Sequence, residues 1–202
     1  MLEIIKNIDT ELFLFLNGIH SSWADFLFYW ISNTFVWTPL YILVCALIIK
    51  RWKKQSIFIL LFLILTVLCT DQTCNIIKKK VHRLRPSHDI ELAEQVHLVE
   101  KPDGQLYRGG KFSFPSAHAA NSCVLVFFFA FFVKARKKWP LWLMIIWSLA
   151  LAYSRIYLGV HYPLDLLGGF FVGSFWSLAL IFLWRNHPKM RGEWANRDIV
   201  TA

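Results

Sequence analysis

Three short clusters place ionisable side chains in a sequence that is otherwise strongly apolar. One of them, SRIYLGVHYPLD, covers residues 154–165 and contains Arg155, His161 and Asp165. Because His161 and Asp165 are four residues apart, the carboxylate can hold one imidazole nitrogen and fix the tautomer. The other nitrogen is then free to act as a nucleophile or a base. A structural ion pair is the alternative interpretation of this spacing.

A second cluster, KKKVHRLRP, covers residues 78–86 and is rich in cations. Lys78 and Arg85 are seven residues apart, which is nearly two helical turns. A helix would therefore point both to one side before Pro86 discourages further helix. Such a pair of cations can bind an anion. A basic collar at the end of a membrane span is the alternative, since Lys and Arg readily reach toward the interface.

A third cluster, PSAHAAN, covers residues 115–121. Proline is favoured at the first position of a helix, so Pro115 predicts a helix start here. The backbone N–H groups of Ser116, Ala117 and His118 would then point away from the helix, and such a helix start binds phosphate well. The alternative is a serine that only caps the helix, beside a histidine without a role in binding.

The composition indicates an integral membrane protein. The chain has 202 residues, of which 56% are hydrophobic, and a mean hydropathy of +0.45. A helix of about 20 apolar residues crosses a hydrocarbon core of about 30 Å. Five runs reach or approach that length, at residues 35–49, 56–76, 115–133, 139–157 and 163–184.

We therefore expect an all-α fold, an integral membrane helical bundle of five or six transmembrane helices in a single domain. Residues 1–34 have apolar residues at helical spacing mixed with charged ones, which predicts an amphipathic segment at the membrane interface. Residues 35–185 would form the catalytic helical core. Residues 186–202 would form a cytoplasmic tail.

The distribution of the net charge of +9 along the chain predicts how the protein is oriented in the membrane. Basic segments at residues 50–54, at residues 134–138 and in the tail each follow the end of a span, which is the positive-inside pattern. These segments are then cytoplasmic, and all three ionisable clusters face the outside. Five basic residues within residues 78–85 are unusual on that side and indicate an anionic partner. The same distribution argues against nucleic acid as a partner.

Several other residues are assigned packing roles. The cysteines fall inside predicted spans without metal-ligand spacing, so we expect free thiols that pack as small apolar groups. Gly169 and Gly173 form a small-xxx-small pair that lets another helix approach closely. We assign Asp71 an interhelical hydrogen bond, with tuning of Lys78 or binding of a substrate hydroxyl as the alternatives. No metal, cofactor or obligate protein partner is expected.

Together, the clusters supply the parts needed for phosphoryl transfer without a metal, in which the protein mainly positions the group and neutralises charge on its oxygens. They resemble the three motifs of the type 2 phosphatidic acid phosphatase superfamily, KxxxxxxRP, PSGH and SRxxxxxHxxxD. Every defined position matches except one, where Ala117 stands in place of the usual glycine. From about residue 35 to residue 185 the span order resembles the membrane-bound bacterial lipid phosphatases of this family. The polar insert at residues 87–111 resembles that of undecaprenyl diphosphatases.

The resemblance implies a role for each matching residue. His161 would attack phosphorus to give a phosphohistidine, and Asp165 would orient it. His118 would protonate the leaving group and then activate the water that hydrolyses the intermediate. The phosphate oxygens would be held by Lys78, Arg85, Ser116, Ala117 and Arg155.

The expected function is metal-independent hydrolysis of a lipid phosphomonoester or diphosphate at the outer face of the bacterial inner membrane. Undecaprenyl diphosphate, phosphatidylglycerol phosphate, phosphatidic acid and the phosphates of lipid A would all present a similar headgroup. A vanadium haloperoxidase-like enzyme is one alternative, but it would be soluble and would need vanadate. An anion-binding or lipid-binding membrane protein without turnover is the other. It predicts losses in the nucleophile cluster, and this sequence has none.

Overall fold

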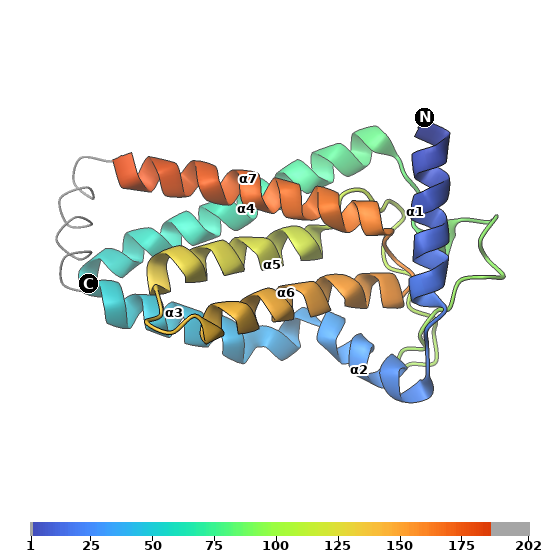
Figure 1. Ribbon diagram of the computed structural model, residues 1–202, viewed down its shortest axis with the longest axis horizontal. Coiled ribbons are helices and arrows are strands. Elements are labelled where there is room, and N and C mark those ends of the chain that lie inside the picture. Colours follow the sequence, from blue (N-terminus) through green and yellow to red (C-terminus); the bar gives the residue numbers. More distant parts are fainter. Residues whose placement is uncertain (1, 187–202) are drawn as a thin grey trace.

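The computed structural model of the chain describes residues 2–186, and the regular structure of these residues is helical. Five elements lie along the long axis of the molecule (Figure 1). These are α3 (Thr38–Trp52), α4 (Ser56–Val81), α5 (Ala117–Phe128) with its π-helical continuation (Phe129–Val133), α6 (Trp139–Tyr157) and α7 (Pro163–Asn186). Two further helices, α1 (Leu2–Asn17) and α2 (Ser22–Ser32), lie toward one end of this bundle. The predicted all-α fold is confirmed.

Three helical stretches among the described residues are long and apolar enough to cross a membrane, and they are Thr34–Val81, Trp139–Tyr157 and Pro163–Asn186. The first contains both α3 and α4, which run in opposite directions because the chain reverses at the 3-10 turn Lys53–Gln55 (Figure 1). Helix α5 with its continuation, Ala117–Val133, is apolar but shorter. The membrane bundle is thus confirmed as an architecture, whereas the number of spans stays a prediction.

The two ends of the bundle carry different groups. The basic turns at residues 50–54 and 134–138 lie at the end drawn on the left in Figure 1. Helices α4 and α6 end, and α5 and α7 begin, at the opposite end. All three ionisable clusters therefore lie at the same end of the bundle. The predicted cytoplasmic tail, residues 186–202, falls outside the described residues except for its first position.

An aromatic core holds the helices together near the basic end. The rings of Trp52, Phe132 and Trp184 are buried and meet edge to face, with centroids 5.6 to 6.3 Å apart. The indole N–H of Trp52 donates to the carbonyl of Phe132 at 2.8 Å, so its polar atom is satisfied. The four cysteines are free thiols, as predicted.

Helices α5 and α7 pack backbone against backbone. A Cβ atom added to Gly169 would stand 2.3 Å from the carbonyl oxygen of Ser116, and one added to Gly173 would stand 2.3 Å from that of Ala120. No side chain larger than hydrogen fits there, which confirms the predicted close approach. The contact brings the start of α5 beside the start of α7, where the Ser116 N–H donates to the carbonyl of Asp165 at 2.9 Å.

Helix α1 crosses the end of the bundle at which the clusters lie (Figure 1). Its inner face carries Asp9, Phe13 and Asn17, which are buried and recur every four residues. Its outer face carries exposed apolar side chains, among them Ile8 and Phe15. This part of the predicted segment 1–34 is therefore an amphipathic helix, and α2 follows it as a separate helix.

Candidate active site

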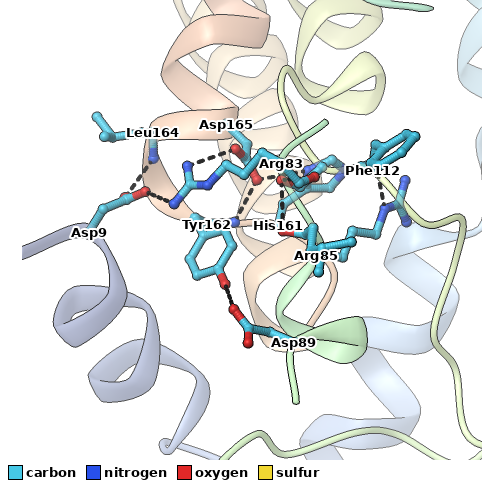
Figure 2. A network of polar contacts seen from close by, with 11 residues as sticks. Asp9, Arg83, Arg85, Asp89, Phe112, His161, Tyr162, Leu164 and Asp165 are labelled. Carbon is cyan, nitrogen blue, oxygen red and sulfur yellow. Dashed lines mark hydrogen bonds and ion pairs between the residues drawn. The ribbon is translucent and has the colours of Figure 1, made fainter. Parts of the chain in front are cut away.

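His161 and Asp165 form a buried pair at the start of α7 (Figure 2). The Nδ1 atom of His161 lies 3.3 Å from Oδ2 of Asp165, and the Tyr162 backbone N–H donates to the same oxygen at 2.8 Å. The Nε2 atom of His161 makes no hydrogen bond within the part of the chain that the structure describes. One nitrogen is thus held and the other is available for chemistry.

The surroundings of His161 set its charge. Burial lowers the pKa of His161 well below its ordinary value, and the cations Arg85 and Arg155 act in the same direction. The imidazole is therefore neutral at neutral pH. A nucleophile needs this state, because only the neutral ring has a lone pair to donate.

Three cations act on this histidine. Lys78 comes from the last turn of α4, Arg85 from the segment that follows it and Arg155 from the last turn of α6. Arg155 is 2% exposed and Arg85 is 8% exposed. Over residues 2–186 none of the three lies within salt-bridge distance of a carboxylate, and Nε of Arg155 has no hydrogen-bond partner. Buried cations are normally paired, so this arrangement indicates a site for an anion.

The end of α4 differs from the prediction. The helix stops at Val81 because His82 adopts a left-handed conformation with φ of 53°, and its N–H donates to the carbonyl of Lys78 at 3.1 Å. Arg85 then lies in extended chain, with φ of −73° and ψ of 151°. The prediction that Lys78 and Arg85 share one helix face is therefore wrong. Both charges nevertheless act on His161.

A surface loop holds Arg85 in place. Its Nε donates to the carbonyl of Phe112 at 3.1 Å, and its backbone N–H donates to that of Lys111 at 3.1 Å. Gly109 has φ of +64°, a conformation that side-chain-bearing residues rarely adopt, and a Cβ atom there would stand 1.9 Å from Nη1 of Arg85, so a larger residue would displace the guanidinium. Burial and then the nearby Arg155 lower the pKa of Arg85 to about 10, which leaves it charged at neutral pH.

The start of α5 also differs from the prediction. Pro115 precedes the helix, and Ser116 is the N-cap, with its hydroxyl accepting from a first-turn N–H at 3.5 Å. The backbone N–H of Ser116 is bonded to Asp165 and is not available to a ligand. The N–H groups of Ala117 and His118 have no acceptor within the helix, because they belong to its first turn. The helix start predicted to bind an anion therefore begins one residue later than expected.

His118 lies between the cation cluster and a cavity. The charges of Arg155, Arg85 and Lys78 all act on it, as they do on His161. The cavity has a volume of about 420 Å³ and runs between α3, α4, α5 and α6, with largely apolar walls. In its wall the Asn121 side chain donates to Asp71 at 3.0 Å, which confirms the interhelical hydrogen bond predicted for Asp71. An apolar group attached to a phosphate at His118 would find room there.

Sequence reasoning missed several residues that hold the site. Arg83 donates to Asp165 at 3.0 Å and to Asp9 at 2.6 Å (Figure 2). Arg155 contacts the hydroxyls of Ser32 and Tyr107, the second at 3.2 Å. These partners come from α1, α2 and the loop before α5. The spacing of residues within one motif therefore could not predict these contacts.

Residues 56–189, well over half of the chain, match the PAP2 superfamily. The chain belongs to the PAP2 superfamily. The match begins at α4 and contains all three ionisable clusters, so the resemblance of their motifs is confirmed. Helices α1, α2 and α3 precede it. Asp9 and Ser32 are therefore contributed from outside the matched PAP2 region.

Individual PAP2 relatives cover most of the chain. A lipid A 4′-phosphatase of Bacteroides thetaiotaomicron is 36% identical over 187 residues, which are 91% of this chain and 80% of that protein. An undecaprenyl-diphosphatase of Sulfolobus acidocaldarius is 28% identical over 195 residues, which are 95% of this chain and 82% of that protein. The crystal structure of a transmembrane PAP2 type phosphatidylglycerolphosphate phosphatase from Bacillus subtilis has a TM-score of 0.66 at 20% identity, and the match covers 89% of this chain and 86% of that one. At that identity the likeness supports the fold.

Proposed function

We propose that this PAP2 protein, a lipid phosphatase, hydrolyses a lipid phosphomonoester or diphosphate at the outer face of the membrane through a phosphohistidine, without a metal. One observation carries the proposal. The neutral His161, held at Nδ1 by Asp165, lies among three cations that have no carboxylate partner within the described chain. This arrangement suits a nucleophile facing a phosphate group.

The reaction has two steps. The Nε2 lone pair of His161 attacks phosphorus, and the bond from phosphorus to the oxygen of the leaving group breaks. His118, which the negative charge of the bound phosphate keeps protonated among the cations, gives a proton to that oxygen. Water then attacks phosphorus, His118 takes its proton, and the P–N bond breaks to return the electron pair to His161. In both steps Asp165 accepts a hydrogen bond from the Nδ1–H of His161. Its negative charge stabilises the imidazolium that forms in the first step.

Cations and backbone N–H groups neutralise the phosphate in this mechanism. Lys78, Arg85 and Arg155 meet its oxygens together with the first-turn N–H groups of α5, as a metal ion would do in other phosphoryl-transfer enzymes. Asp165 is already hydrogen-bonded by His161, Tyr162 and Arg83, so it has little capacity left for a metal. No three His, Cys, Asp or Glu side chains in residues 2–186 form a group that could hold a metal ion.

The cavity beside His118 supports a lipid as the substrate. Its walls are built mainly from apolar side chains of membrane helices, and its volume of about 420 Å³ is that of a small-molecule pocket. The apolar part of a lipid phosphate can enter it while the phosphate lies at the cations. The names of two relatives, lipid A 4′-phosphatase and undecaprenyl-diphosphatase, make those two lipids the first substrates to test.

Phosphate release by the purified full-length protein in excess chelator tests this proposal. We expect release from at least one lipid in a panel of lipid A, undecaprenyl diphosphate, phosphatidylglycerol phosphate and phosphatidic acid. Orthovanadate should inhibit it, because vanadate adopts the five-coordinate shape of the in-line transition state. Activity that disappeared with chelator and returned with magnesium would contradict the metal-free mechanism. Phosphate binding without turnover on any lipid would favour the binding protein instead.

Cysteine labelling tests the side of the membrane on which the site lies. On a cysteine-free background, Glu94→Cys marks the loop beside the site and Ala135→Cys marks the basic turn at the opposite end, and both positions are exposed. The positive-inside rule predicts that an impermeant maleimide added to intact cells labels the first and not the second. Labelling of Ala135→Cys alone would reverse the proposed orientation.

A further inference from the structure

Arg83 lies between two buried carboxylates (Figure 2). Its Nη1 donates to Oδ1 of Asp165 at 3.0 Å, and its Nη2 donates to Oδ2 of Asp9 at 2.6 Å. The other oxygen of Asp9 accepts the backbone N–H of Leu164 at 2.9 Å. Asp9 is 3% exposed, although it belongs to a helix that lies across the end of the bundle. Its carboxylate therefore connects α1 to the start of α7.

We propose that Asp9 is a positioning residue for the catalytic pair. It holds Arg83 so that Arg83 holds Asp165, and Asp165 in turn orients His161. The proposal rests on the function proposed above. It adds to the proposed active site a residue of α1, a helix that lies outside the residues matching the PAP2 superfamily.

The two oxygens of Asp165 have different tasks. Oδ1 accepts from Arg83, whereas Oδ2 accepts the Tyr162 N–H and faces Nδ1 of His161. The carboxylate cannot rotate without breaking one of these contacts. The guanidinium of Arg83 lies over the Tyr162 ring, with Cζ 3.9 Å from the ring centroid. Asp9 completes this arrangement by binding the second arm of the guanidinium.

Asp9 also keeps Arg83 away from the phosphate. The neighbouring cations Lys78, Arg85 and Arg155 are available to an anion, and a bound phosphate would attract a fourth one. With its second arm bound to Asp9, Arg83 stays on Asp165. Without Asp9, phosphate would compete with Asp165 for Arg83, and the contact that orients His161 would loosen as substrate binds.

The charge of Asp9 matters in the first step of the reaction. Asp9, Arg83 and Asp165 together carry one negative charge, which faces the imidazolium that forms when His161 attacks phosphorus. Removing the charge of Asp9 leaves a neutral pair, which stabilises that imidazolium less. The effect falls on the transition state and the intermediate, so it lowers kcat more than it changes KM.

Helix α1 has other anchors, so loss of the Asp9 charge should not detach it. The Phe13 ring packs edge to face on the Tyr162 ring, with centroids 5.3 Å apart. Asn17 donates to the carbonyls of Ile156 and Tyr157 at 3.1 and 2.9 Å, and it accepts from the His97 N–H. A conservative change at Asp9 therefore probes positioning and not the docking of the helix.

Asp9→Asn in the full-length protein tests the inference, with Glu11→Gln, an exposed carboxylate on the same helix, as the matched control. On a lipid that the wild type hydrolyses, we expect kcat of Asp9→Asn to fall about tenfold or more and KM to change less than about twofold. Glu11→Gln should behave like the wild type. Unchanged kcat, or a rise in KM alone, would overturn the positioning role.

A double-mutant comparison separates positioning from a general structural effect. If Asp9 acts through Arg83 and Asp165, Asp9→Asn should lower kcat only slightly in a chain that already carries Asp165→Asn. If Asp9→Asn lowered kcat by the same factor in the wild-type protein and in Asp165→Asn, Asp9 would act independently of Asp165, and the inference would fail. A wild type without turnover would defeat the proposed function and this role together. An active wild type with an unaffected Asp9→Asn variant would defeat this role alone.

Discussion

Replacing His161 with alanine is expected to reduce phosphate release at least about a thousandfold, because removal of a covalent nucleophile eliminates the reaction path and not only one contact. Among the described residues no other histidine has the same setting, since His161 is the one whose Nδ1 is held by Asp165. The protein should stay folded, because within the described residues the His161 side chain hydrogen-bonds only with that carboxylate. Phosphate release and thermal unfolding measure the two effects.

An exposed histidine gives the control for this experiment. His20→Ala removes an imidazole that stacks on His97 and lies on the surface, so it should retain nearly wild-type activity. Wild-type enzyme mixed with substrate labelled in its phosphate and quenched in alkaline denaturant should also carry base-stable, acid-labile phosphate on histidine, and His161→Ala should carry none. Retention of more than a few per cent of wild-type activity in His161→Ala would show that another group is the nucleophile.

Arg155→Ala should lower activity by at least about a hundredfold, since the loss of one donor to a developing oxyanion typically costs that much. The guanidinium is buried, and within the described chain its Nε has no partner and no carboxylate neutralises it. We therefore expect an anion bound in the site to be its main electrostatic partner. Titration calorimetry with orthovanadate should show weaker binding in parallel with the loss of activity.

Two further variants distinguish the loss of a phosphate contact from a loss of folding. Arg155→Lys keeps the charge and should recover part of the vanadate affinity, although lysine cannot reproduce the planar guanidinium. Lys79→Ala removes an exposed cation from residues 78–86 and should leave the activity and the vanadate affinity nearly unchanged. A folded Arg155→Ala that bound vanadate as tightly as the wild type would remove Arg155 from the phosphate site.

The sequence predicts features that depend on neighbours along the chain. Apolar runs predict the membrane helices because a span needs only length and hydrophobicity, and α6 begins and ends where its run does. The contact between His161 and Asp165 follows from their spacing of four across a helix start. The glycines of α7 predict a close helix contact because backbone approach requires small residues.

Features that depend on unusual backbone or on distant chain segments could not be predicted in the same way. Helix α4 ends at a left-handed His82, where neither glycine nor proline marks the end. Asp9 and Arg83 are 74 residues apart, and each is one of many charged residues at the edge of an apolar segment. Periodicity indicates which face of α1 is buried, but it does not say which distant side chain that face meets.

Lys78, Arg85 and Arg155, which have no carboxylate partner within residues 2–186, have a consequence for the end of the catalytic cycle. In the proposed mechanism, inorganic phosphate would remain among Lys78, Arg85 and Arg155 once the leaving group has departed and the phosphohistidine is hydrolysed. The three cations would bind it through the same oxygens as those of the substrate headgroup. The enzyme would then be inhibited by its own product. Its rate would depend on how quickly phosphate is diluted in the surrounding solution, and a high external phosphate concentration would slow it without any separate regulatory site.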